Sequence, residues 1–368
     1  MKALYTLLIL LIPFIVSGQC NRLETVNNFN SIYLNTGVST DELSWTGNIE
    51  TCQSGGVSLI SLQKTLERIN YFRGLVGLPE NIILNNELNE KCQEAALMMH
   101  ANSSLNHYPP IEWSCYSEDG YDAASHSNLA MGTHSSSSIT AYIRDNGSGN
   151  YAVGHRRWIL YSRASEFGTG STSNYNALYV IASTVNAPEN LSFISYPSPG
   201  FFPSQLVFDR WSFSIPNADF SNANIEMQKE NGTQIDLSLE ELANGYGDNT
   251  IVWLPDFDIA SVGDQKIKVI ISNISNSPQN EYEYDVIIMN DVNGNELIHP
   301  PICPENYVWN DILCMCDNGT STNESLSLKV RKKIKIVNVF GQETQIEKNS
   351  PVFYIYDDGS VEKKLIIE

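Results

Sequence analysis

Residues 145–160 read D-N-G-S-G-N-Y-A-V-G-H-R-R-W-I-L, and this stretch decides the fold. Asp145 closes one helical segment, a Gly-rich turn follows, and a second helix begins around His155. An earlier histidine, His107, also stands beside a helix end rather than inside an apolar run. We therefore expect His107 and His155 to face one solvent-reachable cleft.

The apolar spacing predicts two helices upstream of His107. The first covers residues 58–77 and stops before Pro79. Its expected inward residues are Leu59, Leu62, Leu66, Ile69 and Phe72. The second runs from Asn86 to about Asn102, with Asn85 or Asn86 as its cap. Its expected inward residues are Leu88, Cys92, Ala95, Ala96 and Met99.

Downstream of His107 the pattern changes. The Pro-, Ser- and Gly-rich residues 108–136 predict an irregular loop, and a short helix is expected over 139–144. Two strands are expected after the His155 helix, over 166–171 and 177–185. Helices followed by strands in one block indicate a layered α/β domain.

Residues 57–185 resemble a CAP domain, the fold of the cysteine-rich secretory proteins, antigen 5 and the plant pathogenesis-related proteins-1. The motifs that carry the resemblance are N-Y-F-R-G-L-V-G-L-P at 70–79, S-N-L-A at 127–130 and G-H-R-R-W at 154–158. The G-H-R-R-W-I-L form, preceded by D-x-G-x-x-N, is closer to bacterial members. The resemblance implies an α-β-α sandwich with a broad cleft that carries two histidines and two acids and sometimes holds a divalent metal.

Carried onto this chain, the resemblance matches His107 and His155 to the two histidines and Asp145 to the second acid. The loop that should supply the first acid reads H-S-N-L-A, so Ser127 takes its place, with His126 beside it. The expected ligand-binding cleft comprises His107, Ser127, Asn128, Asp145, His155 and Arg156. The candidate metal ligands are His107, His155, Asp145 and His126, with zinc as the candidate ion.

Each candidate has an alternative reading. Two imidazoles and a carboxylate suit zinc and leave a position for an activated water, yet histidines also bond backbone carbonyls and simply organise loops. Ser127 beside His126 reads either as a nucleophile or as a hydrogen-bonding loop residue. Arg156 and Arg157 either bind an anion or hold loops.

Residues 186–292 predict a small antiparallel β-sandwich, Ig-like in outline. The segment Y-P-S-P-G-F-F-P at 196–203 is expected to be a rigid connector, and 231–232 and 245–248 are expected turns. The expected strands are 206–215, 223–228, 250–254, 265–272 and 282–289.

Both ends of the chain carry signals for export. Residues 1–18 have the layout of a secretory signal peptide, and 19–56 form an N-terminal extension. Acylation of Cys20 is the alternative, although Gln19 before it is large for a lipoprotein. After a Cys-containing linker at 293–325, residues 326–368 predict a small β-module with a hairpin at Asp358-Gly359. This module resembles type IX secretion sorting modules, which makes that machinery an expected partner.

The seven cysteines predict disulfides in an oxidising compartment. The expected pairs are Cys92 with Cys115 and Cys20 with Cys52. Cys303, Cys314 and Cys316 are expected to form a small disulfide loop in preference to a zinc site.

The net charge of -20 argues strongly against nucleic acid as a general partner, because a phosphate backbone would be repelled. No stretch qualifies as a membrane span. Three functions remain: a secreted non-catalytic protein whose His-lined cleft binds an extracellular ligand or protein, a metal-dependent hydrolase of peptidase type that uses His107 and His155, and an adhesion or envelope protein. The missing first acid favours the first over the hydrolase.

Overall fold

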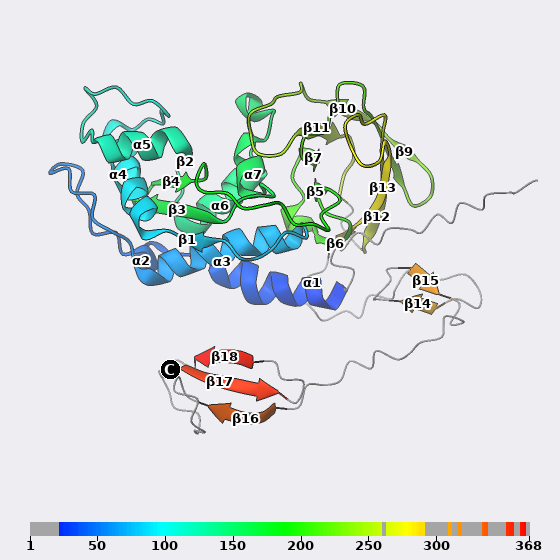
Figure 1. The fold of residues 1–368 in the computed structure, drawn as a ribbon, viewed down its shortest axis with the longest axis horizontal. Coiled ribbons are helices and arrows are strands. Elements are labelled where there is room, and N and C mark those ends of the chain that lie inside the picture. Colours follow the sequence, from blue (N-terminus) through cyan, green and yellow to red (C-terminus); the bar gives the residue numbers. More distant parts are fainter. Residues whose placement is uncertain are drawn as a thin grey trace, which may run out of the picture. The chain divides into compact units, whose positions relative to one another are not determined.

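The computed structural model (Figure 1) describes residues 22–259 and 263–290, together with five short strands nearer the C-terminus. The chain divides into two compact units, the first comprising residues 1–302 and 309–315. The signal peptide, Cys20, Cys303, Cys314 and the turn at Asp358-Gly359 lie outside the described residues. No helix among the described residues is long and apolar enough to cross a membrane.

The N-terminal part of the first unit is a three-layer α-β-α sandwich, as expected. Its sheet has the strand order β1-β3-β4-β2, with β1 and β3 parallel and the other pairs antiparallel. The strands are β1 (Ile83–Leu84), β2 (Ser127–Met131), β3 (Glu166–Ser171) and β4 (Tyr175–Tyr179). The main helices are α3 (Leu59–Leu75), α4 (Asn86–Asn102), α5 (Glu118–His126), α6 (Ser135–Arg144) and α7 (Gly154–Ile159).

Alternation along β4 divides the core between the two faces of the sheet. Ala177 and Tyr179 join the cluster under α4 and α5, whereas Leu178 and Val180 join the cluster shared with α3 and α6. Successive residues of a strand point to opposite faces, so a fully buried strand serves both layers. A Cβ on Gly170 of β3 would lie 2.2 Å from the backbone nitrogen of Gln93, so glycine at this position permits the close approach of α4.

Both predicted N-terminal helices are confirmed. Ser58 caps α3 and Asn85 caps α4 through their side-chain oxygens. The predicted inward face of α4 is largely confirmed, because Cys92, Ala95, Ala96 and Met99 are fully buried. The inward face of α3 begins later than expected. Leu59 lies in its first turn and is 82% exposed.

Two predictions about the middle of this domain are wrong. Residues 108–136 are not an irregular loop, since they contain α5, capped by the Ser117 side chain, and β2. The strand expected over 177–185 begins earlier and ends at Tyr179. After Tyr179 the chain leaves the sheet, because the backbone nitrogens of Val180 and Ile181 both donate to the His126 carbonyl.

The N-terminal extension packs against α3. It contains α1 (Arg22–Asn28), the π-helical turn η1 (Phe29–Tyr33), the 3₁₀ turn η2 (Leu34–Thr36) and α2 (Thr40–Leu43). The Arg68 guanidinium lies over the Tyr33 ring, 3.9 Å from its centroid, and donates to the Tyr33 carbonyl. The extension is therefore part of the folded domain.

The disulfide predictions are corrected. Cys52 is bonded to Cys115, which rules out Cys92 with Cys115 and Cys20 with Cys52. Cys92 is a free, fully buried thiol within α4. The bond ties the loop before α3 to the loop after His107.

Two facing sheets follow. One has the order β10-β11-β7-β5 and is antiparallel. The other has the order β6-β13-β12-β8-β9, in which β6 runs parallel to β13, so the sandwich is mixed rather than purely antiparallel. Their strands are β5 (Ile194–Tyr196), β6 (Gly200–Pro203), β7 (Trp211–Ser214), β8 (Asn224–Lys229), β9 (Gln234–Ile235), β10 (Leu237–Leu239), β11 (Thr250–Pro255), β12 (Gln265–Ser272) and β13 (Tyr282–Met289).

The core between these sheets is aromatic. Phe213 of β7 contacts Tyr282 and Tyr284 of β13. The expected connector at 196–203 lies inside the sandwich and links the two sheets through β5 and β6. The strand expected over 206–215 is shorter. The 3₁₀ turn η4 (Ser204–Leu206) occupies its expected start, and β7 covers only Trp211–Ser214.

Nearer the C-terminus the structure describes β14 (Val308–Asn310) paired with β15 (Met315–Asp317). Three further strands, β16 (Lys333–Val337), β17 (Pro351–Tyr356) and β18 (Val361–Leu365), form one antiparallel sheet. This sheet confirms the prediction of a short C-terminal β-module.

Candidate functional site

Asp145 fixes the position of His155, one of the two histidines expected at the cleft. It caps the end of α6 in the left-handed backbone conformation, with φ at 50°. Its buried carboxylate accepts hydrogen bonds from the His155 Nδ1 at 2.7 Å and from the His155 backbone nitrogen at 2.9 Å. The Arg156 backbone nitrogen lies 3.4 Å from the same carboxylate. One acid therefore orients the ring and satisfies the start of α7.

The other histidine is held by a backbone carbonyl. The His107 Nδ1 lies 2.9 Å from the carbonyl oxygen of Ala124, in α5. A carbonyl only accepts, so this nitrogen carries the proton and the Nε2 of the neutral ring is an acceptor. In its neutral form His155 likewise has an acceptor Nε2, because its Nδ1 donates to a carboxylate.

Both rings line one pocket of about 380 Å³. Among the residues that the structure describes, no Asp, Glu, Lys or Arg side chain lines this pocket. We call it the histidine pocket. Its residues are His107, Tyr108, Ser125, Ser127, Asn128, Gly149, Asn150, Ala152, Gly154, His155, Trp158, Val180, Ile181, Gly245 and Tyr246.

Ser127 and Asn128, both expected at the cleft, line the same pocket. The Asn128 side-chain nitrogen donates to the His155 carbonyl at 3.0 Å, which ties β2 to α7. The Ser127 hydroxyl lies 3.9 Å from the Cys92 sulfur. Among the described contacts, neither pocket imidazole is hydrogen-bonded to Ser127. The serine that does contact a histidine is Ser125, whose hydroxyl lies 2.9 Å from the His126 Nδ1.

The structure places the remaining expected site residues elsewhere. Asp145 is buried behind His155 and does not line the pocket. The His126 Nδ1 bonds to the Asp122 carbonyl at 2.8 Å, and its ring stacks on Tyr179. Arg156 is buried at the junction with the β-sandwich, where it donates to the Arg210 carbonyl at 2.9 Å.

These residues do not fit a metal centre. Over the part of the chain that the structure describes, no group of three or more His, Cys, Asp and Glu side chains is placed to hold a metal ion. His107, His155, Asp145 and His126 therefore do not converge as one ligand set. A zinc ion needs at least three protein ligands in its usual catalytic sites.

Cys92 is not a nucleophile. Burial raises the pKa of its thiol to about 12, so the thiolate is scarce at neutral pH. Reactive cysteines need the opposite environment, partly exposed and electropositive. Cys92 contributes packing between α4 and β2.

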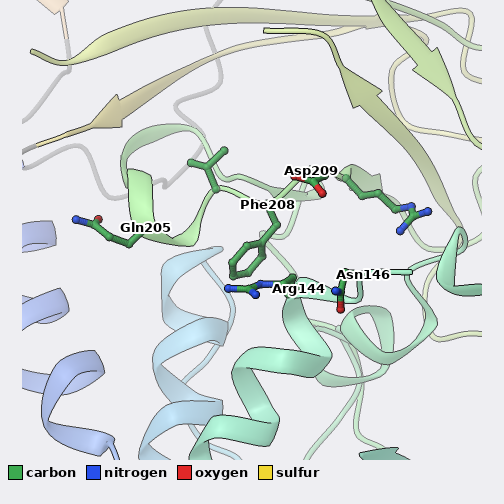
Figure 2. Close-up of a pocket in the computed structure, with 7 residues that line it drawn as sticks. Arg144, Asn146, Gln205, Phe208 and Asp209 are labelled. Carbon is green, nitrogen blue, oxygen red and sulfur yellow. The ribbon is translucent and has the colours of Figure 1, made fainter. Parts of the chain in front are cut away.

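A second pocket of about 310 Å³ lies where the end of α6 meets residues 204–210 (Figure 2). The Arg144 guanidinium lies 5.1 Å from the centroid of the Phe208 ring. On the same wall, Arg210 pairs with Glu240 at 2.7 Å. This pocket contains none of the expected site residues. Its arginines join the end of α6 to the β-sheet region, because Arg144 contacts Phe208 and Arg210 donates to the Asp145 carbonyl at 3.3 Å.

The sequence did not single out the aromatic residues of the histidine pocket. Trp158 was visible only as part of the G-H-R-R-W motif, and Tyr108 only as a loop residue. Gly245 and Tyr246 belonged to a predicted turn in a different domain. The Gly-rich composition of residues 245–248 was enough to predict a turn. Nothing in the sequence indicates which surface that turn approaches.

Comparison with known proteins agrees with this geometry. Residues 66–186 match the family model described as CAP, the cysteine-rich secretory protein family. No curated protein and no solved structure matches the chain. The matched range begins within α3, ends after β4 and includes both pocket histidines. Residues 66–186 of this chain are therefore a CAP domain.

Proposed function

We propose that the protein is a secreted binding protein without catalytic activity, and that it holds a small ligand in the histidine pocket. One observation carries the proposal. His107 and His155 come from separate parts of the chain, line one pocket, and are each fixed through Nδ1. When a ring is neutral, its Nε2 is a preorganised acceptor, which lowers the entropy cost of binding.

The absence of charged lining residues favours binding over catalysis. A hydrolase that uses a metal needs a ligand set that these residues do not supply. An acyl-transfer enzyme needs a nucleophile beside its base. The Asp145–His155 pair has the form of a base with its orienting acid, and this pair is the observation that favours hydrolysis as the second candidate.

Export supports an extracellular setting for the ligand. The disulfide between Cys52 and Cys115 is stable in oxidising compartments. Residues 1–18 supply the proposed signal peptide, and residues 326–368 the proposed type IX sorting module. Bacterial origin and surface display are parts of this proposal.

A fragment screen tests the proposal. Wild-type protein is screened by ligand-observed NMR against a library of neutral and charged small molecules. We expect hits that His107→Ala/His155→Ala loses and His126→Ala, whose ring lies outside the pocket, retains. Hits that survive the double substitution, or no hits at all, would reject the proposal. Hydrolysis of ester or peptide probes that depends on His155 and Asp145 would favour the second candidate instead.

A further inference from the structure

Residues 243–248 of the β-sandwich reach the histidine pocket from outside the CAP domain. Gly245 and Tyr246 lie on its wall beside residues of α7 and β2. The family match ends at residue 186, so this wall comes from outside the matched range. The pocket is therefore incomplete without the β-sandwich.

Arg157 holds this loop in place from α7. Its guanidinium donates to the Ala243 carbonyl at 2.8 Å and to the Asp248 carbonyl at 3.1 Å. The Asp248 carboxylate in turn accepts from the Ser162 backbone nitrogen at 2.9 Å and its hydroxyl at 3.0 Å. Both ends of the loop are thus anchored on the CAP domain, which fixes the position of the residues between them.

Tyr246 lies directly against the start of α7. A Cβ added to Gly154 would lie 2.8 Å from the Tyr246 Cδ1. The Arg157 guanidinium lies 5.4 Å from the centroid of the same ring. Tyr246 nevertheless stays 39% exposed, so the ring is positioned by its contacts and still open to a ligand.

The lining specifies the chemistry of the ligand. Aromatic rings of Tyr246 and Trp158 face the same space as two imidazoles and the Asn128 and Asn150 amides. A charged ligand would enter without an opposite charge on the lining. The Asn128 and Asn150 side-chain nitrogens already donate to the His155 and Asn146 carbonyls. An acyl chain would leave the two imidazole Nε2 atoms without hydrogen bonds. A sugar ring satisfies both requirements, because its C–H face packs on an aromatic ring while its hydroxyls bond to acceptors and amides.

We infer that residues 243–248 form part of the ligand site, and that Tyr246 supplies an aromatic wall for one or two rings of a neutral saccharide. This inference rests on the proposed function and names its ligand class. It also assigns the β-sandwich a role in specificity. A change in the loop would change the ligand without touching the CAP motifs.

The test uses the full mature chain with N-acetylglucosamine, N,N′-diacetylchitobiose, cellobiose and maltose as probes, measured by saturation-transfer NMR and calorimetry. We expect at least one probe to bind, and Tyr246→Ala to weaken it at least tenfold. Tyr246→Phe keeps the ring and should bind like wild type. Leu242→Ala is the matched control, since Leu242 is 43% exposed, lies near the same loop and does not line the pocket.

Gly154→Ala is a second variant that keeps Tyr246 but displaces its ring. It should also weaken binding, with a melting temperature close to that of wild type. Binding that Tyr246→Ala and Gly154→Ala leave unchanged, but that His107→Ala/His155→Ala abolishes, would overturn this inference and leave the proposed function standing. The inference would also be overturned, and the proposed function would stand, if no saccharide binds while other fragments bind in a way that depends on His107 and His155. Saccharide binding that survives all of these substitutions would overturn both.

Discussion

The Asp145 carboxylate accepts from both the Nδ1 and the backbone nitrogen of His155, at 2.7 and 2.9 Å. A single acid thus joins the end of α6 to the start of α7 and sets the ring orientation. In the sequence this acid looked like a metal ligand. In the structure its oxygens are occupied by His155 and the helix start, which leaves the ring nitrogen opposite Nδ1 for the pocket.

Replacing Asp145 should separate these two roles. Asp145→Ala leaves buried donors unpaired, and we expect it to lower the free energy of unfolding by about 1–3 kcal/mol. Asp145→Asn keeps one acceptor and tolerates the left-handed backbone, so it should cost less while still loosening the His155 ring. Urea denaturation of both variants measures the difference. Equal stability of Asp145→Ala and wild type would contradict the assigned contacts.

The disulfide should be a major source of stability. It closes a loop with a sequence separation of 63 residues, and the chain-entropy treatment gives about 4 kcal/mol for a loop of that size. We expect Cys52→Ser/Cys115→Ser to lower the free energy of unfolding by about 2–4 kcal/mol. Non-reducing peptide mapping should show the Cys52–Cys115 peptide and a free Cys92. A Cys92–Cys115 peptide would refute the pairing.

Acid should weaken the fold through two other histidines. Burial lowers the pKa of His100 and of His134 from the ordinary value of 6.5, and each has a buried Nδ1 without a hydrogen-bond partner. The unfolded chain then binds protons that the folded chain does not, so stability falls as the pH drops below about 6.5. His100→Phe/His134→Phe should flatten that dependence in denaturation curves measured between pH 8 and pH 5. An unchanged slope would count against this explanation.

The C-terminal module is open to a direct test. We expect deletion of residues 326–368 to leave the protein in the periplasm of a host that has type IX secretion, while wild type appears outside the cell. Fractionation and immunoblotting measure both. Unchanged export of the shortened chain would remove the sorting role and leave the ligand site unaffected.

Regular apolar patterns made much of this fold predictable. The helix over Asn86–Asn102 and the strands Glu166–Ser171, Gln265–Ser272 and Tyr282–Met289 were predicted with their observed bounds. In the last two strands, apolar residues on the core face alternate with charged ones. Lys266 and Lys268, for example, pair with Asp285 and Glu283 on the neighbouring strand.

Predictions failed where polar residues are buried. The strand Ser127–Met131 contains Ser127 and Asn128, which looked like loop residues but are satisfied by Cys92, His155 and Tyr142. The residues at the domain junction were also hidden in the sequence. Arg156 resembled an anion ligand, whereas burial lowers its pKa to about 10 and its donors go to backbone carbonyls. Local sequence does not specify which backbone carbonyls a buried guanidinium will reach.

The paired arrangement of His107 and His155 can be tested by NMR of protein with ¹⁵N-labelled histidine, at a pH where the rings are neutral. We expect both rings to carry their proton on Nδ1. Both Nε2 signals should shift together when a pocket ligand is added, while those of His100, His126 and His134 should not. A proton on Nε2 of either ring, or a shift of only one of the two, would contradict the shared pocket.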